Sequence, residues 1–186
     1  MSSISRRALL AGGGVSLAAL VGCGNPVGTV NAERLDARVD TTRDYLRRNH
    51  ADLEALFQNA HGILYMPLVS EAGLFVGGAY GQGALRINDV TVDYYSATRA
   101  SFGLQVGAQQ YAHVLFFMTA GALADFRASD GWAASADLRY AVPGSGAAAG
   151  VQTTTAFAPV IAVVFGQSGL IAGASLAGVR YTRIIP

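Results

Sequence analysis

The sequence predicts an α+β fold in which N-terminal amphipathic helices pack on a curved, mainly antiparallel, glycine-rich β-sheet, barrel-like or sandwich, with one further short helix. Three observations lead to this prediction. Apolar residues recur every three or four positions from residue 33 to 57, which is the helical period. After Asn59 the period changes to two, and glycine becomes frequent within the apolar segments. Glycine weakens a strand unless a bend or a close approach requires it, so we expect a strongly curved sheet.

The helical segment carries an apolar stripe and a mixed charged face. Asn31 is the predicted N-cap, and Asn49 followed by Asp52 predicts a break near residues 48 to 50. The stripe consists of Leu35, Val39, Thr42, Leu46, His50, Leu53 and Phe57. Five arginines and six acids share the other face. This balance does not suit an anionic membrane surface, and it favours a helix that packs on the core.

Short strands are predicted for most of the remaining chain. Their expected ranges are 62–69, 73–80, 84–87, 90–95, 100–109, 111–118, 131–141, 151–156 and 160–165, followed by a hairpin over 170–185. Turns are expected at Asn88-Asp89 and at 166–169, and a loop at 143–150. Thr119 is expected to cap a helix over 119–128, and Pro67 to lie at a sheet edge or strand end.

The N-terminus is typical of a lipoprotein signal peptide over residues 1–22. Arg6 and Arg7 precede an apolar run of about fourteen residues, shorter than the ~20 that a membrane-spanning helix needs. Leu20-Val21-Gly22-Cys23 matches a lipobox, and Cys23 is the only cysteine. An unpaired thiol in an exported protein tends to oxidise, and lipidation accounts for it. We therefore expect cleavage before Cys23 and acyl chains, such as palmitate, on its sulfur.

The export route and destination follow from the same region. Ser5-Arg6-Arg7 resembles a twin-arginine export signal, although two arginines are also the ordinary positive charge of any signal peptide. Gly24, rather than Asp, follows the cysteine, and this favours the outer membrane, with the protein facing a periplasm. Residues 23–32 then form the lipidated tether, and residues 33–186 form one domain.

Composition and motifs argue against several function classes. Cleavage leaves 11 arginines and 12 acids, a net charge of −1, so nucleic acid is not an expected partner. His50, His61 and His113 have no metal-site spacing, and His113 is predicted to be a core or sheet histidine. The chain has no Gly-x-Ser-x-Gly elbow, and the glycine-rich residues 77–83 lack the lysine and helix of a phosphate loop. We expect no catalytic residues, metal or cofactor.

Six motifs follow one another along the chain. They are AHGILYMP at 60–67, GGAYGQG at 77–83, YYS at 94–96, SFGLQVGAQ at 101–109, FMT at 117–119 and FGQSGL at 165–170. Together they resemble the SYLF-domain family, also called the actin-patch, lipid-binding domain family, from about residue 33 to the C-terminus. The resemblance implies binding to membrane lipids without catalysis, phosphoinositides being the ligands of eukaryotic members. Those members use a basic N-terminal segment on the membrane, from which the charge-balanced helix here departs.

The leading hypothesis is a non-enzymatic envelope lipoprotein whose domain binds phospholipid or another hydrophobic ligand. Tyr80, Phe102 and Trp132 are candidate lipid contacts, because aromatic rings suit the boundary between apolar and polar surroundings. The same rings would also suit a plain core. The alternative function is a structural protein of the envelope that holds a protein partner.

Overall fold

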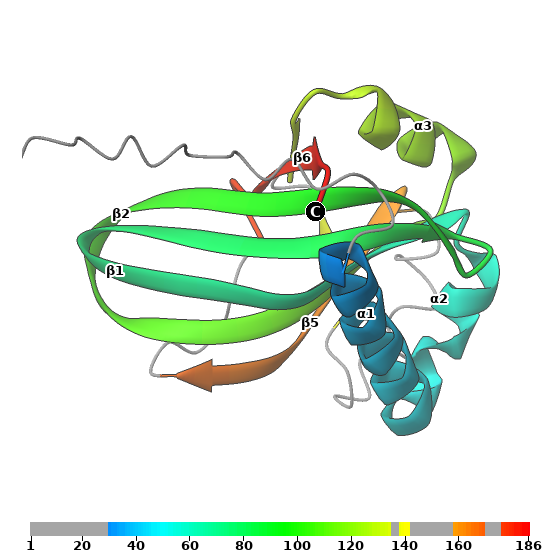
Figure 1. Ribbon diagram of the computed structural model, residues 1–186, viewed down its shortest axis with the longest axis horizontal. Helices are drawn as coiled ribbons and strands as arrows, with labels where there is room; N and C mark the ends of the chain where they lie inside the picture. The colour runs from blue at the N-terminus through cyan, green and yellow to red at the C-terminus, as the bar shows by residue number, and fades with distance from the viewer. Residues whose placement is uncertain (1–29, 135–137, 142–157, 170–175) are drawn as a thin grey trace, which may run out of the picture.

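One long antiparallel hairpin, formed by β1 (Gly62–Ile87) and β2 (Val90–Phe117), is the frame of the body (Figure 1). The computed structural model describes residues 30–134, 138–141, 158–169 and 176–186. Asn88 and Asp89 join the two strands with positive φ angles of 51° and 62°. Such angles at both central residues are what a tight hairpin turn requires, so the predicted turn is confirmed.

The six short strands predicted between residues 62 and 118 are in fact two continuous strands of 26 and 28 residues. The prediction was wrong because strands rarely exceed about ten residues and glycine usually ends them. Here the ladder passes through the glycine-rich segments with register shifts between Met66 and Val69, and between Gly73 and Phe75. Pro67 lies in the first of these shifts, on a strand whose described pairing is with β2 alone. Its predicted edge position is confirmed.

The two halves of β2 hold different neighbours. The first half pairs with β6 (Arg180–Ile184), and the second half pairs with β5 (Val160–Gly169). Beyond these lie β3 (Trp132–Ala133) next to β6, and β4 (Arg139–Ala141) next to β5. Only the β4–β5 pairing is parallel among the described strands. The mainly antiparallel sheet is therefore confirmed.

The C-terminal part departs from the prediction in its details. The turn predicted at 166–169 lies within β5, where Gly166 has a φ of 62° and the register against β2 shifts by a bulge. The hairpin predicted over 170–185 falls partly outside the described residues, and its described strand β6 pairs with β2 and β3. The loop predicted at 143–150 and the strand at 151–156 lie outside the described residues.

The hairpin is bent in its middle, so that the two halves of β1 face each other (Figure 1). A Cβ atom on Gly83 would lie 1.9 Å from the carbonyl oxygen of Tyr65, and one on Gly81 would lie 2.7 Å from that of Leu68. No real side chain fits at such distances, so the two backbones touch only because glycine occupies both positions. The sheet thereby curls into a half-barrel, and the predicted strong curvature is confirmed.

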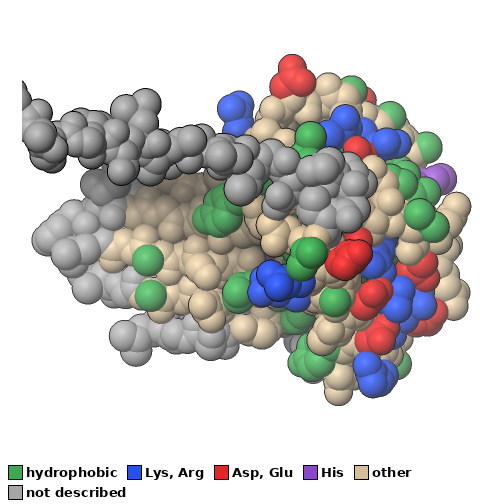
Figure 2. All heavy atoms as spheres, in the orientation of Figure 1, with side chains coloured by type: hydrophobic (Ala, Val, Ile, Leu, Met, Phe, Trp, Pro, Cys, Tyr) green, Lys and Arg blue, Asp and Glu red, His purple; other side chains and the backbone are tan. Residues whose placement is uncertain are grey.

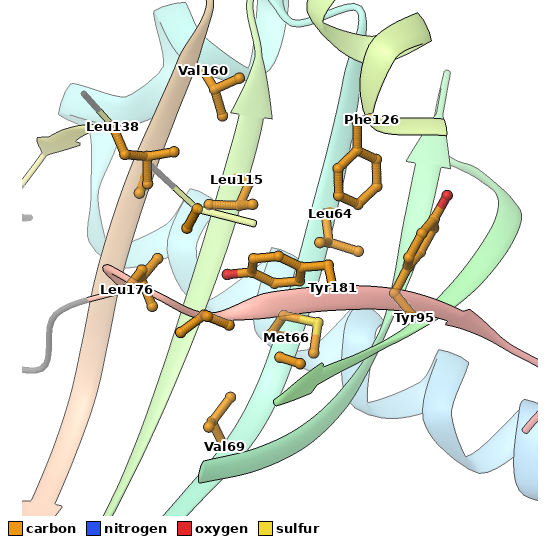
Figure 3. Close-up of a cluster of buried hydrophobic side chains, with 14 of the residues drawn as sticks. Leu64, Met66, Val69, Tyr95, Leu115, Phe126, Leu138, Val160, Leu176 and Tyr181 are labelled. Atoms are coloured by element: carbon orange, nitrogen blue, oxygen red, sulfur yellow. The ribbon is translucent and has the colours of Figure 1, made fainter. Parts of the chain in front are cut away.

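An inner cluster of apolar side chains fills the curl (Figure 3). Leu64 of β1, Tyr181 of β6 and Phe126 of α3 (Ala120–Ala128) converge there. The ring of Phe126 lies 4.6 Å from that of Tyr95 and 4.7 Å from that of Phe117, measured between centroids. The Thr119 side chain accepts a hydrogen bond from the Ala122 backbone amide at 3.2 Å, so the predicted cap and short helix are confirmed.

An outer cluster lies between the convex face of the sheet and the N-terminal helices. Those helices are α1 (Val30–Asn49), the 3₁₀ turn η1 (Ala51–Leu53) and α2 (Glu54–Asn59), so the predicted break near residue 49 is confirmed. Asn31, the predicted N-cap, lies inside α1. The predicted stripe is buried except for His50, which is partly exposed. No helix of the described residues is long and apolar enough to span a membrane.

Two polar groups are buried within the curl. Glu71 accepts hydrogen bonds from its cross-strand neighbour Gln109, at 2.7 Å from the side-chain amide, and from Arg99, and the contact with Arg99 joins the two halves of the bent hairpin. His113 is fully buried, as predicted, and its Nε2 lies 2.7 Å from the hydroxyl of Tyr181. Burial lowers the pKa of His113 to about 3, so this imidazole is neutral at physiological pH.

We expect Gly83→Ala to lower the free energy of unfolding by at least about 3 kcal/mol, because the new methyl group would collide with the Tyr65 carbonyl. Urea unfolding followed by circular dichroism measures the change. Gly121→Ala is the matched control, since nothing lies within 4 Å of a Cβ atom at that helical position. Equal stability of the two variants would contradict the close approach within β1.

Stability should fall as the pH falls below about 6.5, since the unfolded chain protonates His113 there and the folded protein does so only near pH 3. Between pH 7 and pH 5 this one group should remove about 2 kcal/mol from the free energy of unfolding. His113→Gln should lose this component of the pH dependence, whereas His61→Gln, at an exposed position, should keep it. Urea titrations at the two pH values measure the free energies of unfolding. If His113→Gln kept the full pH dependence of the unsubstituted protein, a buried neutral imidazole would be excluded.

Candidate functional site

A groove runs between α1 and the two facing halves of β1. Its lining comes from α1 (Leu35, Arg38), from β1 before the bend (Pro67, Leu68, Ser70) and from β1 after it (Tyr80, Gly81, Gln82). The volume is about 180 Å³. Sites that enclose a whole drug-sized ligand hold about 300–1,000 Å³, so this groove suits one part of a larger molecule.

Two large side chains stand exposed at the groove. Tyr80 is 54% exposed and Leu68 is 43% exposed, although both lie in β1 next to buried residues. The Gln82 side-chain amide donates a hydrogen bond to the Tyr80 hydroxyl at 2.9 Å, which orients the ring. The two residues are twelve positions apart in β1, and the close approach at Gly81 brings the two halves of this strand together. The groove therefore presents an apolar surface with polar atoms at its border.

The charges of α1 are separated onto two flanks of the helix. At 100° per residue, Arg34, Arg38 and Tyr45 share one side of the buried stripe, here called the basic flank. The opposite side, here called the acidic flank, holds Glu33, Asp36, Asp40, Arg43, Asp44 and Arg47. Figure 2 shows acidic and basic side chains gathered over α1 and the tip of the hairpin, and few charged side chains toward the bend.

The acidic flank is bound to the tip of the hairpin. Asp36 accepts hydrogen bonds from the hydroxyls of Thr91 and Tyr94, both at 2.8 Å. Arg86 donates to Asp40 at 2.6 Å, and this hydrogen bond lowers the pKa of the Asp40 carboxyl. Burial, together with the bond to Asp36, raises the pKa of Tyr94 to about 12. These acids are therefore occupied by internal contacts and hold α1 on the sheet.

The basic flank faces the groove. Arg38 lines it, and Arg34 lies one helical turn earlier on the same side. Both side chains belong to exposed residues, and neither forms an ion pair with the described residues. The nearly even charge count of α1, five arginines and four acids, thus conceals a local basic excess at the groove, which the count alone could not reveal.

The three predicted aromatic contacts lie in different places. Tyr80 lines the groove. Trp132 packs against the inner cluster, with its ring 5.5 Å from that of Phe126 and 5.8 Å from that of Tyr181. Phe102 lies in β2 opposite Val76, and its side chain is outside the description. A lipid contact at any of them stays a prediction.

Sequence analysis did not single out Leu68 or Arg38. Leu68 stood in an apolar strand pattern, and only the register shift after Met66 brings it to the surface. The predicted lipid attachment at Cys23 and the export signal at Arg6 and Arg7 lie outside the described residues and stay predictions. In the part of the chain that the structure describes, no three His, Cys, Asp or Glu side chains are grouped to hold a metal ion.

Residues 98–183 match the family described as "Ysc84: Las17-binding protein actin regulator". The match begins within β2 and continues to β6, so the groove between α1 and β1 precedes it in the chain. No curated protein matches the chain. This match identifies a Ysc84, or SYLF, domain segment over residues 98–183, in the second half of the fold.

Proposed function

We propose that this protein is a non-enzymatic envelope lipoprotein whose SYLF domain binds phospholipid at the groove between α1 and β1. The observation that carries the proposal is the exposed pair Leu68 and Tyr80 beside Arg38, which forms no ion pair with the residues that the structure describes. A phospholipid offers a phosphate for the arginine and apolar carbon next to it for the two side chains.

The size of the groove supports partial, rather than complete, enclosure of the lipid. A volume of about 180 Å³ accommodates a headgroup or a short stretch of acyl chain. Exposed Tyr and Leu at such a boundary are typical of surfaces that meet the headgroup level of a bilayer, where an aromatic ring has both apolar and polar neighbours. The remaining acyl chain would stay in the membrane.

The anchor is the second part of the proposal. The signal peptide with Arg6 and Arg7 would direct export. Acyl chains on Cys23 would then hold the domain at a membrane that faces the periplasm, with the outer membrane as the favoured location. The mature net charge of −1 supports this division of roles, since bulk charge would not hold the protein on an anionic surface.

A protein partner is the alternative. The family description names a protein ligand, Las17, so members of this family are described by protein binding. The corresponding function here would be a structural protein of the envelope. Recovery of one stoichiometric envelope protein with the Cys23→Ser chain, without affinity for vesicles, would favour this alternative.

Tyr80→Ala should weaken binding of the Cys23→Ser chain to phosphatidylglycerol vesicles about fivefold, because the ring would no longer bury apolar area at the headgroup level. Vesicle sedimentation over a lipid titration gives the affinity. Val90→Ala is the matched control, since Val90 is 64% exposed and lies outside the groove. The same loss in both variants, or none in Tyr80→Ala, would remove the groove from the proposal.

Cys23→Ser should move most of the protein from the membrane fraction to the aqueous fraction of the cell envelope, because the acyl chains supply most of the attachment. Fractionation with an antibody against the domain measures the distribution. The control substitution Ser16→Ala leaves the lipobox unchanged, and this variant should remain with the membrane. Unchanged retention of Cys23→Ser would show that something other than acyl chains on Cys23 holds the protein there.

A further inference from the structure

The position at which α1 begins restricts which membrane the groove can meet. Seven residue steps separate Cys23 from Val30, the first residue of α1, and a fully extended chain covers at most about 3.6 Å per step. The tether therefore places the start of α1 within about 25 Å of an acylated Cys23. A domain of this length has a radius of gyration of about 15 Å, so its body is at least about 30 Å across. The extended tether is therefore shorter than the width of the body.

The groove lies near that same end of the molecule. Leu35 and Arg38 follow Val30 by five and eight residues, which are about 8 Å and 12 Å along a helix. Val30 itself is 60% exposed. The exposed apolar side chains of the groove and the start of the tether thus belong to one region of the surface.

The charges of this region favour contact with a bilayer. Arg34 and Arg38 project from the basic flank, whereas the acids Asp36 and Asp40 are bound to the hairpin on the other flank. Glu33 is exposed but lies about 100° round the helix from Arg34. The apolar stripe of α1 is buried on the sheet, so contact would use the flank of the helix rather than its apolar face.

We propose that the face formed by Arg34, Arg38, Leu68 and Tyr80 docks in cis, on the same bilayer that holds the molecule's own Cys23 anchor. This inference rests on the proposed function, since it requires both the anchor and phospholipid binding. A facing membrane would have to be reached by the side of the body away from the tether, and the groove is not on that side. The lipid bound in the groove is therefore drawn from the leaflet that carries the anchor.

The test uses the lipidated full-length protein in vesicles of phosphatidylethanolamine and phosphatidylglycerol. Acylation occupies the only native thiol, so an introduced cysteine is the single labelling site. Ser70→Cys places a fluorescent label at the groove, and Ala124→Cys places one on the exposed side of α3. Lipids with a spin label at the headgroup should quench the label at position 70 several-fold more than the label at position 124. Mixing two vesicle populations, one without protein, should produce no aggregation.

Equal quenching at the two positions, or aggregation of the mixed vesicles, would overturn docking in cis. The proposed function has its own readout, which is sedimentation of the unanchored Cys23→Ser chain with the same vesicles. If that chain binds vesicles while position 70 of the lipidated protein is not quenched, docking in cis is lost and phospholipid binding stands. If the Cys23→Ser chain binds no vesicles, phospholipid binding itself is excluded, and docking in cis is excluded with it.

A charge variant tests the named face. In the Cys23→Ser chain, Arg34→Gln and Arg38→Gln should each weaken binding to anionic vesicles about fivefold, and increasing salt should reduce the difference. Arg47→Gln is the matched control, because it removes the same charge from the acidic flank. A loss for Arg47→Gln as large as that for Arg38→Gln would exclude the basic flank as the docking face.

Discussion

The contact between the two halves of β1 is the constraint on which the rest of the structure depends. At Gly81 and Gly83 the backbone of the second half lies against the carbonyl oxygens of Leu68 and Tyr65. This contact folds a hairpin with strands of 26 and 28 residues into a half-barrel, whose curl encloses the inner cluster. It also brings Leu68 and Tyr80 to one groove. The glycines of β1 thus create both the core and the candidate site.

The apolar stripe, the acidic flank and the basic flank of α1 contact different parts of the molecule. Its apolar stripe covers the convex side of the sheet, and its acidic flank is held by Arg86, Thr91 and Tyr94 near the hairpin tip. On the basic flank, Arg34 and Arg38 form no ion pair with the described residues. The internal contacts of Asp36 and Asp40 therefore occupy these acids and leave positive charge beside the groove.

A small and open groove is consistent with an anchored protein. Once acyl chains hold the domain at a bilayer, lipid headgroups are present at a high effective concentration, and weak contacts suffice for occupancy. On the proposed function, the anchor supplies residence at the membrane and the groove supplies selection of a lipid. The charge-balanced helix, which departs from the basic segment of eukaryotic SYLF members, fits this division because it need not attach the protein by itself.

Features that depend on neighbouring residues were determined by the sequence alone: the stripe of α1, the turn at Asn88 and Asp89, the Thr119 cap and the curvature expected from glycine. Their physics is local, as periodicity, φ preference and capping involve only a few successive residues. The tertiary structure decided that six predicted strands are two, that Leu68 meets Tyr80, and that Asp40 pairs with Arg86. These contacts join residues 12 to 46 positions apart, and only the folded chain determines which distant residues meet.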